Sequence, residues 1–300
     1  MSAGSPIPLV VALLLAPLMQ GVIVRTKSVM AGRTGQALLQ PYREVWKLLR
    51  KGAVYSQTTS SVFRLGPVIG LAAVVLALTL VPLGSFSGLA SFWGDFVVLA
   101  YLLGLGRFFT VLAALDTGSS FEGMGASREV TFAALAEAAF LLSLAGLVRA
   151  TGELSLTAIL TSLSATSWAH AAPRLGLALA ALVIVGLSEN ARIPVDDPTT
   201  HLELTMIHEV MVLDHGGPDL AMIEYGAALK MWLFASIIGA VAVPWHAGCG
   251  WIDLGLGVGA IMGMAILTGL IESAMARLRL LRVPQLLLTA IVLAGLALAL

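Results

Sequence analysis

The residues from Glu189 to Tyr225 hold the densest group of titratable side chains in the chain. This segment contains eight of the 17 acidic residues and three of the five histidines. The acidic residues are Glu189, Asp196, Asp197, Glu203, Glu209, Asp214, Asp219 and Glu224. A polar block between apolar segments marks where a membrane protein meets water, a partner or a proton path. We therefore expect the functional face to lie here.

The three histidines of this block are candidate metal ligands. His201, His208 and His215 are seven residues apart and would share one face of a helix. The zinc motif HExxH needs its histidines four apart, and residue 212 is Val where the second would stand. No nucleophile-elbow motif supports Ser–His–Asp hydrolysis either. We predict a polar helix face against a partner subunit, with no catalytic, cofactor-binding or metal-binding residue in this chain.

Composition identifies an integral membrane protein. Hydrophobic residues make up 58% of the chain, charged residues only 11%, and the mean hydropathy is +0.95. Soluble domains carry about 25% charged residues. A net charge of zero gives no electrostatic case for nucleic acid. Cys249 is the single cysteine, so an iron–sulfur cluster would have to sit in another chain.

Apolar segments of bilayer-crossing length predict an all-α, polytopic bundle of about eight helices in one membrane domain, residues 1–300. We expect them at 7–24, 62–83, 94–115, 130–149, 175–190, 221–243, 252–273 and 280–300. Residues 153–168 are too polar to count. Positive charge follows the first segment, which predicts a retained helix and both termini outside; the alternative is an unusual signal peptide. Gly255, Gly259 and Gly263 predict close helix packing.

The loops after odd-numbered spans carry most of the Lys and Arg, which predicts that these loops are cytoplasmic in an inner-membrane protein. They are 25–61, 116–129 and 190–220, and we expect them to form one docking face. Within the first, Tyr42 to Lys51 has the pattern of a short amphipathic surface helix. A solvated loop attracted to anionic lipid is the alternative. The second loop, 116–129, is rich in Gly and Ser, and this composition predicts that it is flexible.

Several charges fall inside or at the ends of the predicted spans, where burial without a partner is costly. Arg107, Glu137 and Lys230 lie within spans, and Glu189, Glu224 and Glu272 lie at span ends. Such groups at one level of a bundle are typical of a hydrated proton path. Interfacial side chains that reach the headgroups are the alternative, which we favour for Glu272.

Local signals predict a helix inside the polar block. Pro194 and Pro198 end the fifth span, and Thr200 with Glu203 fits a capping box. The new helix should run to about Asp214 and end at Gly216–Gly217.

The segment ARIPVDDPTTHLELTMIHEVMVLDHGGPDLAMIEY resembles the signature loop of the respiratory-chain NADH dehydrogenase subunit 1 family. It is most similar to the branch found in membrane-bound nickel–iron hydrogenases, the formate hydrogenlyase and hydrogenase 4 component C type. Two other segments support the same resemblance: GRTGQALLQPYREVWKLLRKG at 32–52 and RFFTVLAALDTGSSFEGMGASRE at 107–129. Thr199 and His201, where the quinone-reducing branch is richer in carboxylates, favour the hydrogenase branch. Asp214–His215 and Glu122 depart from the hydrogenase pattern.

The resemblance implies a helical subunit that anchors a hydrophilic electron-transfer arm and joins it to antiporter-like membrane subunits. Arg192, Asp196, Glu203 and Glu189 match the family's residues around its broken helix. The nickel–iron centre and iron–sulfur clusters are then expected in the hydrogenase large and small subunits. The quinone-site subunit of a respiratory NADH dehydrogenase and a stand-alone ion transporter remain alternatives.

These inferences combine into one hypothesis, a non-catalytic subunit of a proton- or sodium-coupled membrane hydrogenase. The expected proton path comprises Arg107, Glu137, Glu189, Glu203, Glu209, Glu224 and Lys230. The expected docking loop is shaped by Arg192, Asp196, Asp197 and Asp214.

Overall fold

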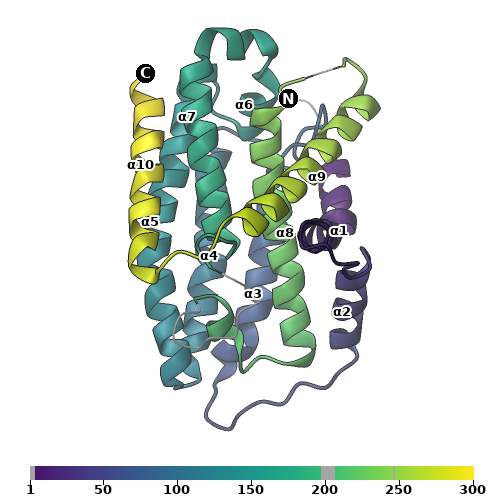
Figure 1. Cartoon of the computed structure of the whole chain (residues 1–300), viewed down its shortest axis with the longest axis vertical. Coiled ribbons are helices and arrows are strands. Elements are labelled where there is room, and N and C mark those ends of the chain that lie inside the picture. Colours follow the sequence, from purple (N-terminus) through teal and green to yellow (C-terminus); the bar gives the residue numbers. More distant parts are fainter. Residues whose placement is uncertain (1–3, 197–206, 246) are drawn as a thin grey trace.

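The computed structural model describes residues 4–196, 207–245 and 247–300, and these residues form a helical bundle (Figure 1). Eight of its helices are long and apolar enough to cross a membrane, which confirms the predicted fold class. They are α1 (Ile7–Met30), α3 (Ser61–Leu78), α4 (Asp95–Asp116), α5 (Ser120–Thr151), α7 (Ala165–Glu189), α8 (Gly217–Ala242), α9 (Gly250–Ala274) and, together with the turn before it, α10 (Val283–Ala299). The shorter elements are α2 (Gln40–Leu49), α6 (Leu156–Ser162), η1 (Glu209–Val212) and η2 (Leu280–Arg282).

Helix α8 is the most buried of the spans, and it packs against α1, α2, α3, α7 and α9. Leu229, Trp232 and Leu233 of α8 are almost fully buried in the main apolar core. Close approach elsewhere depends on glycine. A Cβ at Gly66 of α3 would lie 2.9 Å from Ala113 of α4, and one at Gly269 of α9 would lie 2.8 Å from Thr26 of α1.

Both chain ends lie at one end of the bundle (Figure 1). The opposite end carries residues 50–60, 117–119 and 207–216, and we call it the loop end. An even number of spans requires the two termini to share a side of the membrane.

Two spans begin about ten residues earlier than their hydropathy predicts. Helix α7 begins at Ala165, where the Ser164 hydroxyl accepts the backbone N–H of Ser167 at 3.2 Å. Helix α5 begins at Ser120, inside the expected flexible loop. Gly125 lets η1 lie directly on α5, because a Cβ there would clash with the Val210 side chain and lie 3.0 Å from Cγ of Met211. Small residues pack well at the starts of α5 and α7, although they lower the mean hydropathy from which the span boundaries are predicted.

The helix expected from residue 200 to Asp214 is wrong over its described part. Residues 207–216 hold only the single 3-10 turn η1, and the α-helix starts again at Gly217. The Asp196 carboxylate accepts the backbone N–H groups of Ile207 and His208 at 3.1 and 3.2 Å. Both donors are therefore committed to a side chain instead of a helical carbonyl. The expected capping-box residues, Thr200 and Glu203, lie outside the described residues.

The amphipathic helix predicted at residues 42–51 is present as α2 and begins next to Pro41. Its Tyr42 hydroxyl donates to the carbonyl oxygen of Leu14 in α1 at 2.5 Å, which fixes α2 against the bundle. The exposed Trp46 ring lies 4.7 Å from the guanidinium of Arg50.

The prediction of close packing at Gly255, Gly259 and Gly263 is wrong within this chain. A Cβ at any of the three would meet no atom within 4 Å among the described residues. Helix α9 instead approaches α1 at Gly269.

Candidate functional site

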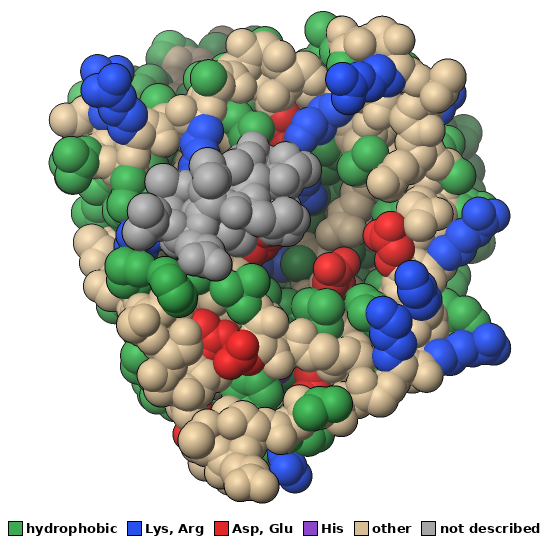
Figure 2. All heavy atoms as spheres, turned by 60° about the horizontal axis from the view of Figure 1, so that its bottom comes forward, with side chains coloured by type: hydrophobic (Ala, Val, Ile, Leu, Met, Phe, Trp, Pro, Cys, Tyr) green, Lys and Arg blue, Asp and Glu red, His purple; other side chains and the backbone are tan. Residues whose placement is uncertain are grey.

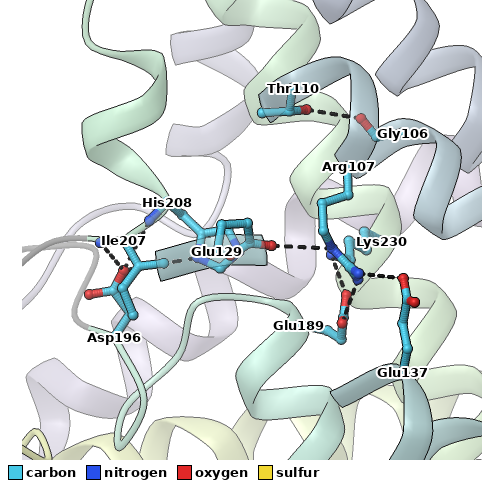
Figure 3. A network of polar contacts seen from close by, with 10 residues as sticks. All are labelled: Gly106, Arg107, Thr110, Glu129, Glu137, Glu189, Asp196, Ile207, His208 and Lys230. Atoms are coloured by element: carbon cyan, nitrogen blue, oxygen red, sulfur yellow. Dashed lines mark hydrogen bonds and ion pairs between the residues drawn. The ribbon is translucent and has the colours of Figure 1, made fainter. Parts of the chain in front are cut away.

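Arg107 is the centre of a buried ion-pair network between α4, α5 and α7 (Figure 3). Its Nη1 lies 2.5 Å from Glu137 Oε1, its Nη2 2.6 Å from Glu189 Oε1, and its Nε 3.2 Å from Glu129 Oε1. The Arg107 side chain is 9% exposed, and those of Glu129 and Glu189 are 7% and 6% exposed. The fork of the guanidinium allows one cation to hold three carboxylates at once.

Lys230 of α8 joins the network at Glu189. Its Nζ lies 2.7 Å from Glu189 Oε2, so one carboxylate at the end of α7 binds cations from α4 and α8. Lys230 lies 13 residues after Gly217, about 20 Å along the helix at 1.5 Å per residue. The structure thus brings together four residues of the predicted proton path: Arg107, Glu137, Glu189 and Lys230.

A sharp turn after α7 directs the next charged residues away from that helix. Ala191 has a left-handed backbone (φ 49°), and the N–H of Arg192 donates to the Leu187 carbonyl at 2.9 Å, which closes the helix end. The left-handed conformation costs a non-glycine residue about 1 kcal/mol. Because of this turn, Arg192 reaches Glu272 of α9 (Nη1–Oε1, 3.4 Å).

Glu272 is a buried anchor and does not reach the membrane surface, so the interfacial interpretation of this residue is wrong. Its side chain has no exposed area, and its Oε2 lies 2.8 Å from the Nζ of Lys27 in α1. The carboxylate therefore ties α1 and the residues after α7 to α9.

Asp196 connects the loop end to the bundle. Its Oδ1 accepts from Arg277, which follows α9, at 2.9 Å, while its Oδ2 holds the start of η1. The imidazole of His208 lies beside it, with Nδ1 4.0 Å from Asp196 Oδ2 and Nε2 3.3 Å from Glu129 Oε2. Figure 3 shows His208 between these two carboxylates.

A cavity of about 460 Å³ borders both the network around Arg107 and the ion pairs of Glu272. Its apolar wall comes mainly from α3, α4 and α8. Its charged lining is Lys27, Arg107, Glu129, Glu189, Arg192, His208, Glu209, His215, Glu224, Lys230 and Glu272. On the loop end, acidic side chains lie around a hollow, and Lys and Arg side chains gather along one side (Figure 2). A chamber lined by both apolar and charged side chains can hold an amphiphile or water next to titratable groups.

The remaining predicted residues lie around this site. Glu209 and Glu224 line the cavity, whereas Asp214 is exposed and donates its backbone N–H to the buried Glu122 (3.3 Å). Asp197 and Glu203 lie outside the described residues.

The ring of His215 stacks on that of Phe63 in α3, with centroids 3.9 Å apart and planes 8° apart. Burial lowers the pKa of His215 below 6.5, although the nearby Asp219 and Asp214 act in the opposite direction. His215 and His208 therefore serve different contacts and do not form the single polar helix face that the sequence predicts.

Sequence reasoning missed Glu129, Lys27, Arg277 and the bridging position of His208. Glu129 could have been found, because it lies eight residues before Glu137 on α5, about two helical turns away. In the part of the chain that the structure describes, no group of three His, Cys, Asp or Glu side chains could hold a metal ion.

A family model described as NADH dehydrogenase matches residues 5–300. The chain belongs to this family. It is 29% identical to formate hydrogenlyase subunit 4 of Escherichia coli K12, over 91% of each chain. It is 33% identical to hydrogenase-4 component C of the same organism, over 78% of this chain and 73% of the relative. These relatives confirm the resemblance to the hydrogenase branch.

The fold matches a chain in the solved structure of the membrane-bound sulfane sulfur reductase, an archaeal respiratory membrane complex. The TM-score is 0.82 and the identity 19%, over 97% of this chain and 96% of the other. This chain is thus a multi-pass membrane protein of a family whose members include subunits of hydrogenase complexes.

Proposed function

We propose that this chain is the non-catalytic membrane subunit that links the electron-transfer arm of a membrane-bound nickel–iron hydrogenase to proton or sodium translocation. The observation that carries the proposal is the network around Arg107, in which titratable groups within the spans approach the loop end through Glu129, His208 and Asp196. The similarity to two hydrogenase-complex subunits supports the choice of complex.

The charges of the network fit this role. Arg107 and Lys230 supply two positive charges against the three carboxylates Glu129, Glu137 and Glu189. With all groups ionised and His208 neutral, one carboxylate is in excess, so the network can accept one proton. A unit charge appearing at a distance on the order of 10 Å would change the energy of that proton by about 1.7 kcal/mol at an effective dielectric constant of 20. That is more than a tenfold change in proton affinity.

Electron transfer in a docked arm would supply such a charge. In this proposal the loop end faces the cytoplasm, the termini lie outside, and the iron–sulfur and nickel-binding subunits dock beside Arg192, Asp196, Asp197 and Asp214. The metal centres belong to those subunits, and antiporter-like subunits join the bundle within the inner membrane.

The test has two steps. The tagged chain, isolated in mild detergent, should copurify with a nickel-binding large subunit and an iron–sulfur subunit, identified by mass. The assembled complex in liposomes should then keep hydrogen evolution in Glu137→Gln while linked ion translocation falls severalfold. The exposed Glu153 gives a matched control, since Glu153→Gln should change neither quantity. Unchanged ion translocation in Glu137→Gln would remove that residue from the path.

The 460 Å³ cavity favours a second candidate, the quinone-site subunit of a respiratory NADH dehydrogenase. Copurification with NADH-binding chains and a large subunit without nickel-binding cysteine pairs would establish that function instead. Ion transport by the purified chain alone in liposomes would establish a stand-alone transporter.

A further inference from the structure

His208 occupies the point where two groups of charges meet. On one side, Asp196 is fixed by Arg277 and by two backbone N–H groups of residues 207 and 208. On the other, Glu129 is fixed by Arg107. The His208 side chain lies within 4 Å of both carboxylates, at 3.3 Å from Glu129 and 4.0 Å from Asp196.

Both ring nitrogens of His208 are buried, and neither completes a hydrogen bond with a described residue. A neutral imidazole has one N–H and can donate to one of the two carboxylates, whereas an imidazolium can donate to both. The tautomer decides which carboxylate this is, because Nε2 faces Glu129 and Nδ1 faces Asp196. The site therefore has distinct hydrogen-bonding states within the same backbone.

We propose that His208 is a positioning and relay residue of the ion path: it passes protons between the Asp196 side and Glu129 and thereby couples η1 to the Arg107 network. The inference rests on the function proposed above and adds a residue to it. In one passage, Nδ1 gains a proton from the loop end as Nε2 gives its proton to Glu129 Oε2, so the imidazole is neutral before and after. A ring flip then turns the protonated Nδ1 towards Glu129 and the free Nε2 towards the loop end, so a second passage, with Nε2 gaining a proton and Nδ1 giving one up, returns the ring to the first tautomer.

Charged groups from several elements surround His208. Glu129 faces it from α5, with Arg107 of α4 behind Glu129, and Asp196 faces it from the segment after α7, with Arg277 behind Asp196. Glu209 follows it on η1 and lines the same cavity. Two fixed carboxylates, each held by its own arginine, give the imidazole an acceptor on either side.

The first experiment tests the geometry in the full chain, without the complex. Nitrogen-15 histidine labelling in nanodiscs should show that Glu129→Gln changes the Nε2 resonance of His208 and that Asp196→Asn changes its Nδ1 resonance. His170, an exposed histidine of α7, should not respond and serves as the internal control. If neither substitution changes the His208 resonances, the proposal is overturned, whatever complex the chain belongs to.

The second experiment tests the role in the assembled complex. His208→Gln keeps one donor and one acceptor but cannot carry a proton across, so hydrogen evolution should continue while ions moved per hydrogen fall severalfold. His170→Gln should change neither quantity. The double variant His208→Gln/Glu129→Gln should lose no more coupling than the more affected single variant, because both residues serve one route. Normal coupling in His208→Gln overturns the relay, whereas a wild-type complex without ion translocation overturns the proposed function and leaves the resonance test to decide the geometry.

Discussion

Replacing Arg107 with methionine should destabilise the protein by about 3 kcal/mol, at the low end of the 3–5 kcal/mol typical when one partner of a buried ion pair is removed. The three carboxylates differ in how well they remain stabilised once Arg107 is removed. Glu189 keeps Lys230 at 2.7 Å, and the side chain of Glu137 is 43% exposed on the surface of this chain. The cost falls mainly on Glu129, which is 7% exposed and retains only His208 nearby among the described residues.

The free energy of unfolding can be followed in detergent by the fluorescence of the six tryptophans. Arg107→Met/Glu129→Gln should recover about half of the loss, because the carboxylate without its cation has been neutralised. Arg149→Met is the matched control. Arg149 is exposed and donates to the Leu298 carbonyl at 2.5 Å, so its loss should cost about 1 kcal/mol or less. The reasoning fails if Arg107→Met costs no more than this control or if the second substitution recovers nothing.

Three further predictions test other contacts. Glu272→Gln should cost about 3 kcal/mol in the same unfolding assay, because it leaves two cations facing each other in a buried site, whereas the exposed Glu153→Gln should cost almost nothing. Gly125→Ala should displace η1 and make it easier to cleave by limited proteolysis, while Gly123→Ala, with no atom within 4 Å of a new Cβ, should not. Because burial lowers the pKa of His215, the unfolded state binds its proton more readily; stability should be complete above about pH 6.5 and fall as the pH drops towards the folded pKa. His215→Phe should flatten that part of the stability curve measured between pH 7 and 5.

The number of spans was predictable because bilayer thickness sets the length of each apolar helix. The boundaries that failed share a cause. The starts of α5 and α7 are rich in Gly, Ser and Thr, which hydropathy counts as loop. In the structure, the contact with η1 leaves no room for a side chain at position 125, and Ser164 caps a helix. Both reasons depend on neighbours or on local hydrogen bonds, and a hydropathy average contains neither.

The deepest charges of the site were also predictable, because a charged residue far inside a span is rare and usually has a partner or a function. Their partners were not. Arg107 and Glu189 are 82 residues apart in sequence, and Arg192 and Glu272 are 80 apart. The predicted span begins one residue later, at residue 130, which leaves Glu129 in the expected loop. The position of Glu272 at a span end predicts an interfacial side chain, whereas in the structure this side chain has no exposed area and pairs with Lys27 and Arg192.

The network also makes helix packing and function depend on the same residues. Each of α4, α5, α7 and α8 supplies a charge that would be costly to bury alone, so the charges are compatible with the bilayer only when the four helices assemble. A substitution can therefore impair coupling merely by loosening the bundle. The exposed fractions separate the two effects: Glu137→Gln alters a carboxylate that is 43% exposed, and Glu129→Gln one that is 7% exposed. Glu137→Gln should consequently change ion translocation with little loss of unfolding free energy, whereas Glu129→Gln should lower both. Equal destabilisation by the two variants would mean that a partner-free bundle already holds both carboxylates with the same strength, contrary to the packing described above.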